Sequence, residues 1–162
     1  MNRKGFTLIE LILVMSLLSL LALLLIGNLN TSLKKGRDAQ RKNDLNQIQK
    51  SLEIYYEDNQ KYPPYLAFSD KFCSTDACST TDTIYMVKLP KDPTGNYVYT
   101  YISEPTGAYY YLYSYIENDL DQGAAVSKAG FTTNASCGAS DEVKCRYYVS
   151  SSNAPQLTPS PL

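Results

Sequence analysis

The feature that most constrains this chain is an apolar run from Phe6 to Ile26, which is uncharged except for Glu10 near its start. Seventeen of its twenty-one residues are apolar. As a helix the run would extend about 30 Å, which is enough to cross the hydrocarbon layer of a membrane. A carboxylate within that layer costs roughly 2.5–3.5 kcal/mol, so Glu10 is expected to have a specific role.

The run lies directly behind a short basic leader, and the sequence across the junction is Arg3-Lys4-Gly5-Phe6-Thr7-Leu8-Ile9-Glu10. This arrangement resembles the processing signal of type IV pilins and of type II secretion pseudopilins. The resemblance implies that a membrane prepilin peptidase cuts between Gly5 and Phe6 and that the new Phe6 amine is methylated. Gly5 suits such a cut because it has no side chain to obstruct the scissile bond. The resemblance also implies that Glu10 pairs with the Phe6 amine of an adjacent subunit during assembly.

Two plainer interpretations of the run are a simple membrane anchor and a cleaved secretory signal. A secretory signal has a shorter apolar core and a small-x-small cleavage site after it. Here Ala22 is the only alanine of the run, and no such site follows. The basic residues at 34–42 outnumber those before the run, which by charge alone would favour the opposite topology. The four cysteines and fifteen tyrosines that follow the run instead indicate an exported domain, with the amino terminus in the cytoplasm.

Charge divides the chain unevenly. Residues 1–42 hold seven basic and two acidic side chains, whereas residues 43–162 hold eight basic and fourteen acidic ones. An acidic exported part argues against a nucleic-acid groove, which requires clustered Lys and Arg, and nothing in the sequence demands DNA uptake. The basic cluster at 34–42 is expected near lipid headgroups or near acidic faces of neighbouring subunits.

The helical pattern is expected to continue past the run to about Asp58, because no proline occurs before Pro63. Apolar residues recur at helical spacing at Leu45, Ile48, Leu52 and Tyr55, which predicts one buried stripe. Gly27 and Gly36 are candidate weak points of this helix. The expected organisation is a leader at 1–5, a transmembrane and filament-core helix at 6–26, an amphipathic continuation at 27–59, a globular domain at 60–150 and a flexible Ser/Pro/Thr tail at 151–162.

Three tyrosine-rich or β-branched segments predict strands at 97–102, 109–116 and 146–150. Alternation places Tyr110 and Leu112 on the strand face that can cover the helix. It places Tyr111 and Tyr113 on the opposite face, where they can meet a neighbouring subunit. The helix end at Tyr62-Pro63 and the turn Pro90-Lys91-Asp92-Pro93-Thr94-Gly95-Asn96 are similar to the major pseudopilin family. The fold class is therefore α+β and pilin-like, with a long amino-terminal helix packed against a small antiparallel sheet.

The four cysteines allow three disulfide pairings. The preferred pairing is local, Cys73 with Cys78 and Cys137 with Cys145, because each has a close sequence neighbour and export exposes it to oxidation. A zinc site is the alternative, but the chain has no histidine and its cysteine spacings differ from those of zinc knuckles.

An acidic loop, residues 117–121, follows the second tyrosine-rich segment. Major pseudopilins bind calcium in a loop after the corresponding strand, so the resemblance makes Glu117, Asp119 and Asp121 candidate calcium ligands. A solvated acidic turn is the preferred interpretation, because the glycine-rich stretch typical of that calcium loop is not evident after Gln122-Gly123. No cofactor is therefore expected, and calcium is the one alternative that the resemblance adds.

No catalytic arrangement emerges, since histidine and a glycine-rich phosphate loop are both lacking. The chain is therefore not expected to be an enzyme, and the resemblance implies a structural subunit of a type IV pilus or a type II secretion pseudopilus. The implied partners are further copies of the chain, sister pilins, a prepilin peptidase, an assembly ATPase and a platform membrane protein. The precursor is expected in the cytoplasmic membrane and the product in an extracellular pilus or periplasmic pseudopilus. A membrane-tethered extracellular binding module that never polymerises is the alternative from a different class.

Overall fold

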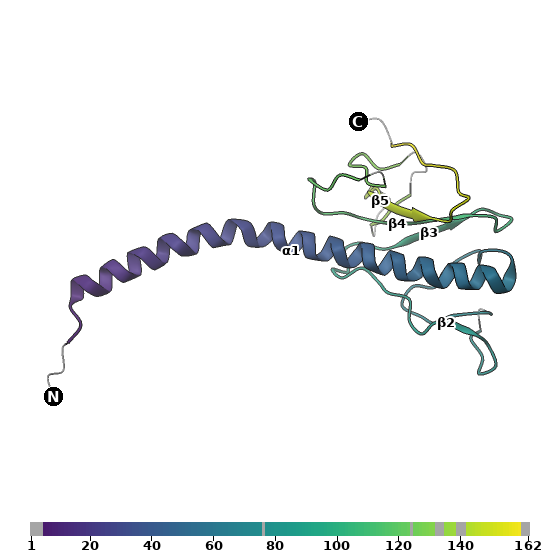
Figure 1. Ribbon diagram of the computed structural model, residues 1–162, viewed down its shortest axis with the longest axis horizontal. Coiled ribbons are helices and arrows are strands. Elements are labelled where there is room, and N and C mark those ends of the chain that lie inside the picture. The colour runs from purple at the N-terminus through teal and green to yellow at the C-terminus, as the bar shows by residue number, and fades with distance from the viewer. Residues whose placement is uncertain (1–4, 76, 124, 132–134, 139–141, 160–162) are drawn as a thin grey trace.

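The computed structural model describes residues 5–75, 77–123, 125–131, 135–138 and 142–159, without the side chains of residues 24–28. Its elements are one helix, α1 (Leu8–Asn59), and five short strands: β1 (Phe72–Cys73), β2 (Ile84–Met86), β3 (Thr100–Ser103), β4 (Tyr110–Ser114) and β5 (Tyr147–Ser150). The first half of α1 projects away from the domain as a gently curved rod, and the second half lies within it (Figure 1).

The helix α1 has 52 residues, so it is about 78 Å long. It begins after the N-cap Thr7 and ends at Gln60, whose left-handed conformation and N–H bond to the Tyr56 carbonyl close the last turn. Pro63 and Pro64 follow shortly after Gln60, so the helix ends where the sequence predicted. The helix passes through Gly27 and Gly36 without interruption, so the weak points suggested by the sequence do not break it.

A three-stranded antiparallel sheet in the order β3-β4-β5 packs across the second half of α1. Leu45, Ile48 and Leu52 of α1 are fully buried against Tyr110 and Leu112 of β4. These are the helix stripe and the strand face that the sequence patterns predicted, and their burial is the main apolar contribution to docking the helix on the sheet.

The opposite face of the sheet is covered by the chain's own carboxyl-terminal segments. Tyr111 and Tyr113 pack there with Phe131, Cys137 and Cys145. The Tyr111 hydroxyl donates to the Pro155 carbonyl at 2.5 Å. The expectation that these tyrosines face a neighbouring subunit was therefore wrong, because the sheet is buried on both sides.

The segment expected as a loose tail makes specific contacts as far as it is described. The Ser151 N–H donates to the Tyr110 carbonyl at 3.4 Å, and Asn153 donates to the Ala108 carbonyl at 2.8 Å. Pro159 forms an isolated bridge with Phe131. Residues 160–162 lie outside the described residues.

A second, two-stranded sheet of β1 and β2 was not predicted. It lies on the other side of α1 from the three-stranded sheet (Figure 1). Its strands are too short to show an alternating pattern, and they are joined by the polar, disulfide-closed loop at 74–83. The strand expected at 97–102 also begins later, at Thr100, because Val98 donates instead to the Cys137 carbonyl outside the sheet.

The turn between β3 and β4 generates a first prediction. Gly107 has a φ of +75°, and a Cβ there would lie 2.9 Å from the Tyr62 carbonyl oxygen. Gly95 has a similar φ of +72° but open space around it. Gly95→Ala should therefore cost only the left-handed strain, about 1–2 kcal/mol. Gly107→Ala should cost about 1–3 kcal/mol more, because the Tyr62 backbone has to move. Urea unfolding of the detergent-solubilised chain, followed by tyrosine fluorescence, measures both; equal losses would contradict the close-approach explanation.

Candidate functional site

The amino-terminal end of α1 holds the residues expected for processing and assembly. Phe6 is 75% exposed, and a Cβ built on Gly5 would meet no atom within 4 Å. Both residues precede the first helical turn and are therefore open to an approaching partner. Met1 to Lys4, which form most of the expected leader, lie outside the described residues.

Glu10 is held in the first turn of α1 by Thr7. The Glu10 N–H donates to the Thr7 hydroxyl oxygen at 3.4 Å. The Glu10 carboxylate accepts from the Thr7 hydroxyl at 3.2 Å and from the Thr7 N–H at 3.5 Å. This reciprocal arrangement is a capping box, which satisfies helix-end donors and keeps the carboxylate at the Phe6 end of the helix.

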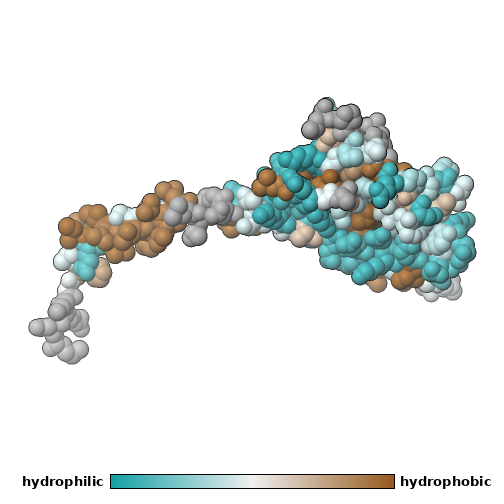
Figure 2. Space-filling view, turned by 45° about the horizontal axis from the view of Figure 1, so that its top comes forward, coloured by the Kyte–Doolittle hydropathy of each residue, from teal (hydrophilic) through white to brown (hydrophobic). Residues whose placement is uncertain are grey.

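The first half of α1 presents apolar side chains on all its sides. The exposed ones are Leu8, Ile9, Leu11, Ile12, Leu13, Val14, Met15, Leu17, Leu18, Leu20, Leu21 and Leu23. They form the brown surface of the rod, in contrast to the largely hydrophilic domain (Figure 2). An exposed apolar surface of this extent marks a site of interaction.

No helix within the described part of the chain is long and apolar enough to cross a membrane. The span expected at 6–26 includes residues 24–26, whose side chains lie outside the described set.

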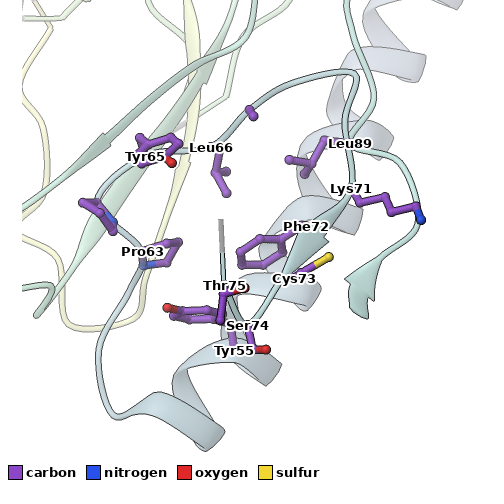
Figure 3. A pocket seen from close by; sticks show the side chains of 12 residues that line it. Tyr55, Pro63, Tyr65, Leu66, Lys71, Phe72, Cys73, Ser74, Thr75 and Leu89 are labelled. Atoms are coloured by element: carbon purple, nitrogen blue, oxygen red, sulfur yellow. The ribbon is translucent and has the colours of Figure 1, made fainter. Parts of the chain in front are cut away.

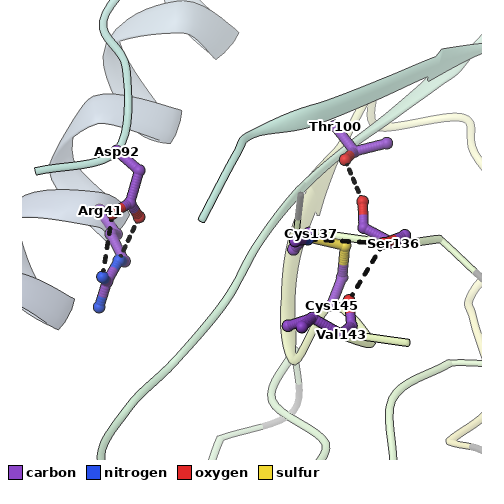
Figure 4. The surroundings of a disulfide bond; sticks show 8 residues. Arg41, Asp92, Thr100, Ser136, Cys137, Val143 and Cys145 are labelled. Carbon is purple, nitrogen blue, oxygen red and sulfur yellow. Dashed lines mark hydrogen bonds and ion pairs between the residues drawn. A yellow bond between two sulfur atoms is a disulfide. The ribbon is translucent and has the colours of Figure 1, made fainter. Parts of the chain in front are cut away.

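Where α1 enters the domain, Arg41 is completely buried and contacts three carboxylates. Its Nε and Nη2 atoms bind Asp92 at 2.6 and 3.2 Å (Figure 4). Its Nη1 atom binds Asp38 at 2.7 Å, and Nη2 also lies 2.8 Å from Glu117. Arg37, one turn earlier, forms a bidentate pair with Glu117 at 2.9 and 2.5 Å.

These charged side chains form what we call the ion cluster, which attaches two loops to one turn of α1. Its members are Arg37, Asp38, Arg41, Asp92 and Glu117. The Asp38 carboxylate accepts from the backbone N–H groups of Glu117 and Asn118 at 3.0 and 2.8 Å. Asp92 closes its own turn by accepting from the N–H and hydroxyl of Thr94 at 2.9 and 2.6 Å. The Asp92 turn noted in the sequence therefore serves as an anchor for Arg41.

The cluster also shifts the pKa values of its members. Burial alone would lower the pKa of Arg41, but its hydrogen bonds to Asp92 and Glu117 outweigh that effect and raise it. Burial likewise favours a high pKa for Asp92, yet the hydrogen bonds from Arg41 and Thr94 hold it below its usual value. The Arg37 hydrogen bond lowers the pKa of Glu117 most strongly. All of these groups therefore remain charged at neutral pH.

The three candidate calcium ligands are each paired with a cation of the chain. Glu117 binds Arg37 and Arg41, Asp119 binds Arg146 at 2.8 Å, and Asp121 binds Lys42 at 2.6 Å. Within the described residues, no group of three acidic or thiol side chains is placed to hold a metal ion. Calcium binding at this loop stays an untested prediction.

The same pairs change the interpretation of the basic cluster at 34–42. Arg37, Arg41 and Lys42 bind carboxylates of their own domain rather than facing lipid or a neighbour. Lys34 and Lys35 are the exposed members of the cluster. Sequence reasoning missed this because the partner carboxylates lie about 50 to 80 positions away.

All four cysteines form disulfides, in the local pairing expected from the sequence. Cys137–Cys145 is buried and closes a hairpin against the tyrosine face of the sheet (Figure 4). Cys73–Cys78 closes the loop that follows β1. Such short closures typically contribute a few kcal/mol at most, and they fix loops that have little core of their own.

A small cavity of about 80 Å³ lies beside the Cys73–Cys78 loop, between Tyr55, Pro63, Phe72 and Leu89 (Figure 3). Pockets for small organic ligands usually measure roughly 300–1,000 Å³. The cavity is therefore a packing gap where the segment after α1 meets β1, and it is not large enough for a substrate.

Two family models match the chain. The first is described as a prokaryotic N-terminal methylation motif and matches residues 1–26. The second is described as type II secretion system protein G and matches residues 28–129. Together they cover the amino-terminal signal, the rest of α1 and the domain through the acidic loop.

Curated relatives point in the same direction. Type II secretion system core protein G of Vibrio cholerae is 31% identical over 106 residues, which is 63% of this chain and 72% of that protein. The core protein G of Aeromonas hydrophila is 30% identical over 100 residues, or 59% and 70% of the two chains. The type IV wide pilus major component PilA4 of Thermus thermophilus is 43% identical over 61 residues, covering 38% of this chain and 47% of that one. No solved structure matches the chain.

The ion cluster generates a second prediction. Arg41→Met should destabilise the domain by about 3–5 kcal/mol, because it leaves buried carboxylates unpaired. Asp92 and Glu117 have lowered pKa values in the folded state. Their contribution to the free energy of unfolding is therefore fully present above their unfolded-state pKa values of about 3.9 and 4.3, and it is lost as the pH falls below those values and through the lower folded-state ones. The variant should therefore lose less stability than the wild type on acidification. Urea unfolding between neutral and acidic pH measures both effects.

Arg37→Met is the matched control, since the Arg37 side chain is 34% exposed and Glu117 retains Arg41. Its effect should be clearly smaller than that of Arg41→Met. An Arg41→Met variant as stable as the Arg37→Met variant would contradict the anchoring role of the buried guanidinium.

Proposed function

The chain belongs to the type II secretion system protein G family, and we propose that it is cut between Gly5 and Phe6 and polymerises through α1. It is a structural subunit of a type IV pilus or a secretion pseudopilus, as its relatives in both groups are. The family match to residues 28–129 favours the pseudopilus branch, whereas the PilA4 match favours a pilus.

The observation that carries the proposal is the exposed apolar half of α1. A dozen apolar residues between Leu8 and Leu23 have no contact with the domain, which is itself packed around the second half of the same helix. A soluble protein that kept this surface in water would aggregate. Two environments would cover it: lipid before assembly, and the α1 helices of other copies afterwards.

Moving α1 from lipid into a bundle of α1 helices should cost little free energy. A helix satisfies its backbone hydrogen bonds internally, so it can lie in lipid or in a bundle without rearranging. Helices leave lipid for one another through van der Waals packing and polar contacts, without exposing apolar surface to water. The precursor would accordingly reside in the cytoplasmic membrane, with the domain outside, until it is extracted into the filament.

Glu10 would provide the register of assembly. Cleavage after Gly5 creates a charged amine at Phe6, which would be costly to bury alone in an apolar filament core. The Glu10 carboxylate of a neighbouring copy would neutralise it, and a low dielectric would make that pairing strong. Thr7 already bonds the carboxylate in the isolated chain, so Glu10 is held near the helix end before a partner arrives.

The proposed partners follow from these steps. A prepilin peptidase would remove the leader and methylate Phe6, an assembly ATPase and a platform protein would drive extraction, and sister pilins would share the filament. The chain itself would act as substrate and building block rather than as an enzyme.

A third prediction tests processing. In Gly5→Leu, the branched side chain should obstruct the peptide bond before Phe6, so the full-length precursor should accumulate in the membrane. Mass spectrometry of the amino terminus in cells with the matching peptidase measures this outcome. Gly36→Leu, at an exposed and open position of α1, is the control and should be cut normally. A Gly5→Leu protein that begins at Phe6 would refute the cleavage site.

A fourth prediction separates assembly from cleavage. Glu10→Ala should still be cut after Gly5, because it only makes the apolar run more uniform. It should fail to form filaments when it is the only copy, since each buried Phe6 amine would lack a partner at a cost of several kcal/mol. Sheared filaments quantified by immunoblot and imaged by electron microscopy measure assembly, and Glu57→Ala, at the other end of α1, is the control.

The outcomes also decide between the proposal and a tethered binding module. Filaments made solely of Glu10→Ala subunits would refute the pairing mechanism. A wild-type chain that is cleaved but forms no filament with its complete assembly machinery would refute polymerisation and favour the tethered module.

A further inference from the structure

Two lysines of α1 are exposed where the helix leaves the domain. Lys34 and Lys35 lie just before the ion cluster, and neither forms an ion pair within the described part of the chain. The next cations along the helix differ, because Arg37, Arg41 and Lys42 bind carboxylates of the domain. The charges of Lys34 and Lys35 are therefore available to a partner.

The carboxylates of the loop that follows β4 do not cancel these charges. Each of them has its own cation, in the pairs Glu117–Arg37, Asp119–Arg146 and Asp121–Lys42. The ion cluster holds one carboxylate more than it has guanidinium groups, and that excess negative charge is largely buried. Three exposed lysines outweigh it: Lys34, Lys35 and Lys128. Lys34 and Lys128 both lie close enough to Asp119 to contribute to its lowered pKa, of which the Arg146 hydrogen bond is the main cause.

This loop lies at the end of the domain from which the rod projects (Figure 1). Two grooves border it, and each reaches one of the two helix lysines. The first, of about 250 Å³, is lined by Lys34, Tyr97, Tyr115, Glu117, Asp119 and Arg146. The second, of about 440 Å³, is bordered by Lys35 and by Leu120, which is 75% exposed. Lysine, tyrosine and an exposed leucine are side chains typical of a protein surface at a membrane interface.

The position of the lysines along α1 matches the level of lipid headgroups. The apolar run ends at Ile26, and Lys34 follows eight positions later on an uninterrupted helix, which is about 12 Å further along. The headgroup layer beyond the hydrocarbon is about 5–8 Å thick on each side of a bilayer. A charge a few ångströms above that layer is still within the Debye length of about 8 Å at physiological salt.

We propose that the domain of the membrane-resident precursor docks on anionic lipid headgroups through Lys34 and Lys35, with Leu120 beside them. The inference rests on the proposed function, because it requires α1 to hold the chain in a bilayer. The occupant is a lipid surface, since the two lysines follow the apolar rod directly and burial of the rod would bring headgroup phosphates to their level.

Two lysines are sufficient because the domain is already tethered. Each lysine near an anionic surface strengthens the attraction about fivefold. The rod keeps the domain at the membrane, so the contact only has to orient it and does not have to recruit it from solution. The docked domain would stay against the membrane while the precursor is stored, and extraction of the rod would break the contact.

The first test measures how well lipid protects each lysine. The full chain is reconstituted in nanodiscs of phosphatidylcholine, with or without anionic phosphatidylglycerol, and is acetylated briefly before mass spectrometry. In the anionic discs Lys34 and Lys35 should react at least about fivefold more slowly. Lys61, exposed just beyond the other end of α1, is the internal control and should react equally in both discs. Salt at about 1 M should remove the difference, because the Debye length falls to about 3 Å.

The second test reports the position of the loop. The chain contains no tryptophan, so Leu120→Trp introduces a single fluorophore at an exposed position. Lipid that is spin-labelled at its headgroup should quench this fluorophore at least about twofold more strongly in anionic discs. Adding Lys34→Gln and Lys35→Gln should abolish the gain, whereas adding Lys61→Gln should leave it unchanged. All variants should keep the melting temperature of the wild type, since the replaced side chains are exposed.

Each result has a defined meaning. Equal acetylation in the two discs, or quenching that persists without Lys34 and Lys35, would overturn the inference while the proposed function stands. Protection by inorganic phosphate in phosphatidylcholine discs would assign the lysines to a free anion and would also overturn it. Protection in native membranes but not in anionic discs would identify a protein partner instead. A chain that does not enter the discs would overturn membrane residence, and with it the proposed function and this inference together.

Discussion

The buried Arg41 guanidinium determines how the rest of the molecule is arranged around α1. Its carboxylate partners come from the helix itself, from the turn before β3 and from the loop after β4. Removing that many charges from water costs free energy. The cost is offset because all three guanidinium nitrogens bind carboxylates and because Asp38 also accepts from two backbone N–H groups. The sheet is therefore fixed to the helix by apolar packing along β4 and by ion pairs at the point where α1 enters the domain.

This location of the ions gives one helix two kinds of surface. Before the cluster, α1 exposes apolar side chains, and beyond it the buried face of α1 is the apolar stripe on which the sheet packs. Within the cluster the charged groups point inward and amide side chains point outward. Internal ion pairs and a hydrogen bond to Tyr99 keep the charges of this stretch on the domain side of the helix, at Arg37, Asp38, Arg41, Lys42 and Asp44.

The elements that could be predicted from the sequence are those with a local signal. The Phe6–Ile26 run, the Leu45–Ile48–Leu52 stripe and the prolines after Gln60 were sufficient to predict α1, and the spacing of the cysteines was sufficient to suggest the disulfides. The Arg41 cluster could not be predicted, because an arginine in a basic segment looks solvated until a carboxylate from a distant loop is placed beside it. The β1–β2 sheet was missed for a related reason, since strands of two and three residues carry no periodicity.

The tyrosine-rich strand β4 shows how alternation predicts faces but not their partners. Its two faces were assigned correctly, yet only tertiary structure shows that both are buried, one under α1 and the other under the Cys137–Cys145 hairpin and the segment up to Pro159. A three-stranded sheet covered on both faces needs no neighbour to complete its core. The part of the domain that is most hydrophobic in sequence is thus an internal core. An exposed apolar surface of a dozen side chains lies instead on the first half of α1, from Leu8 to Leu23.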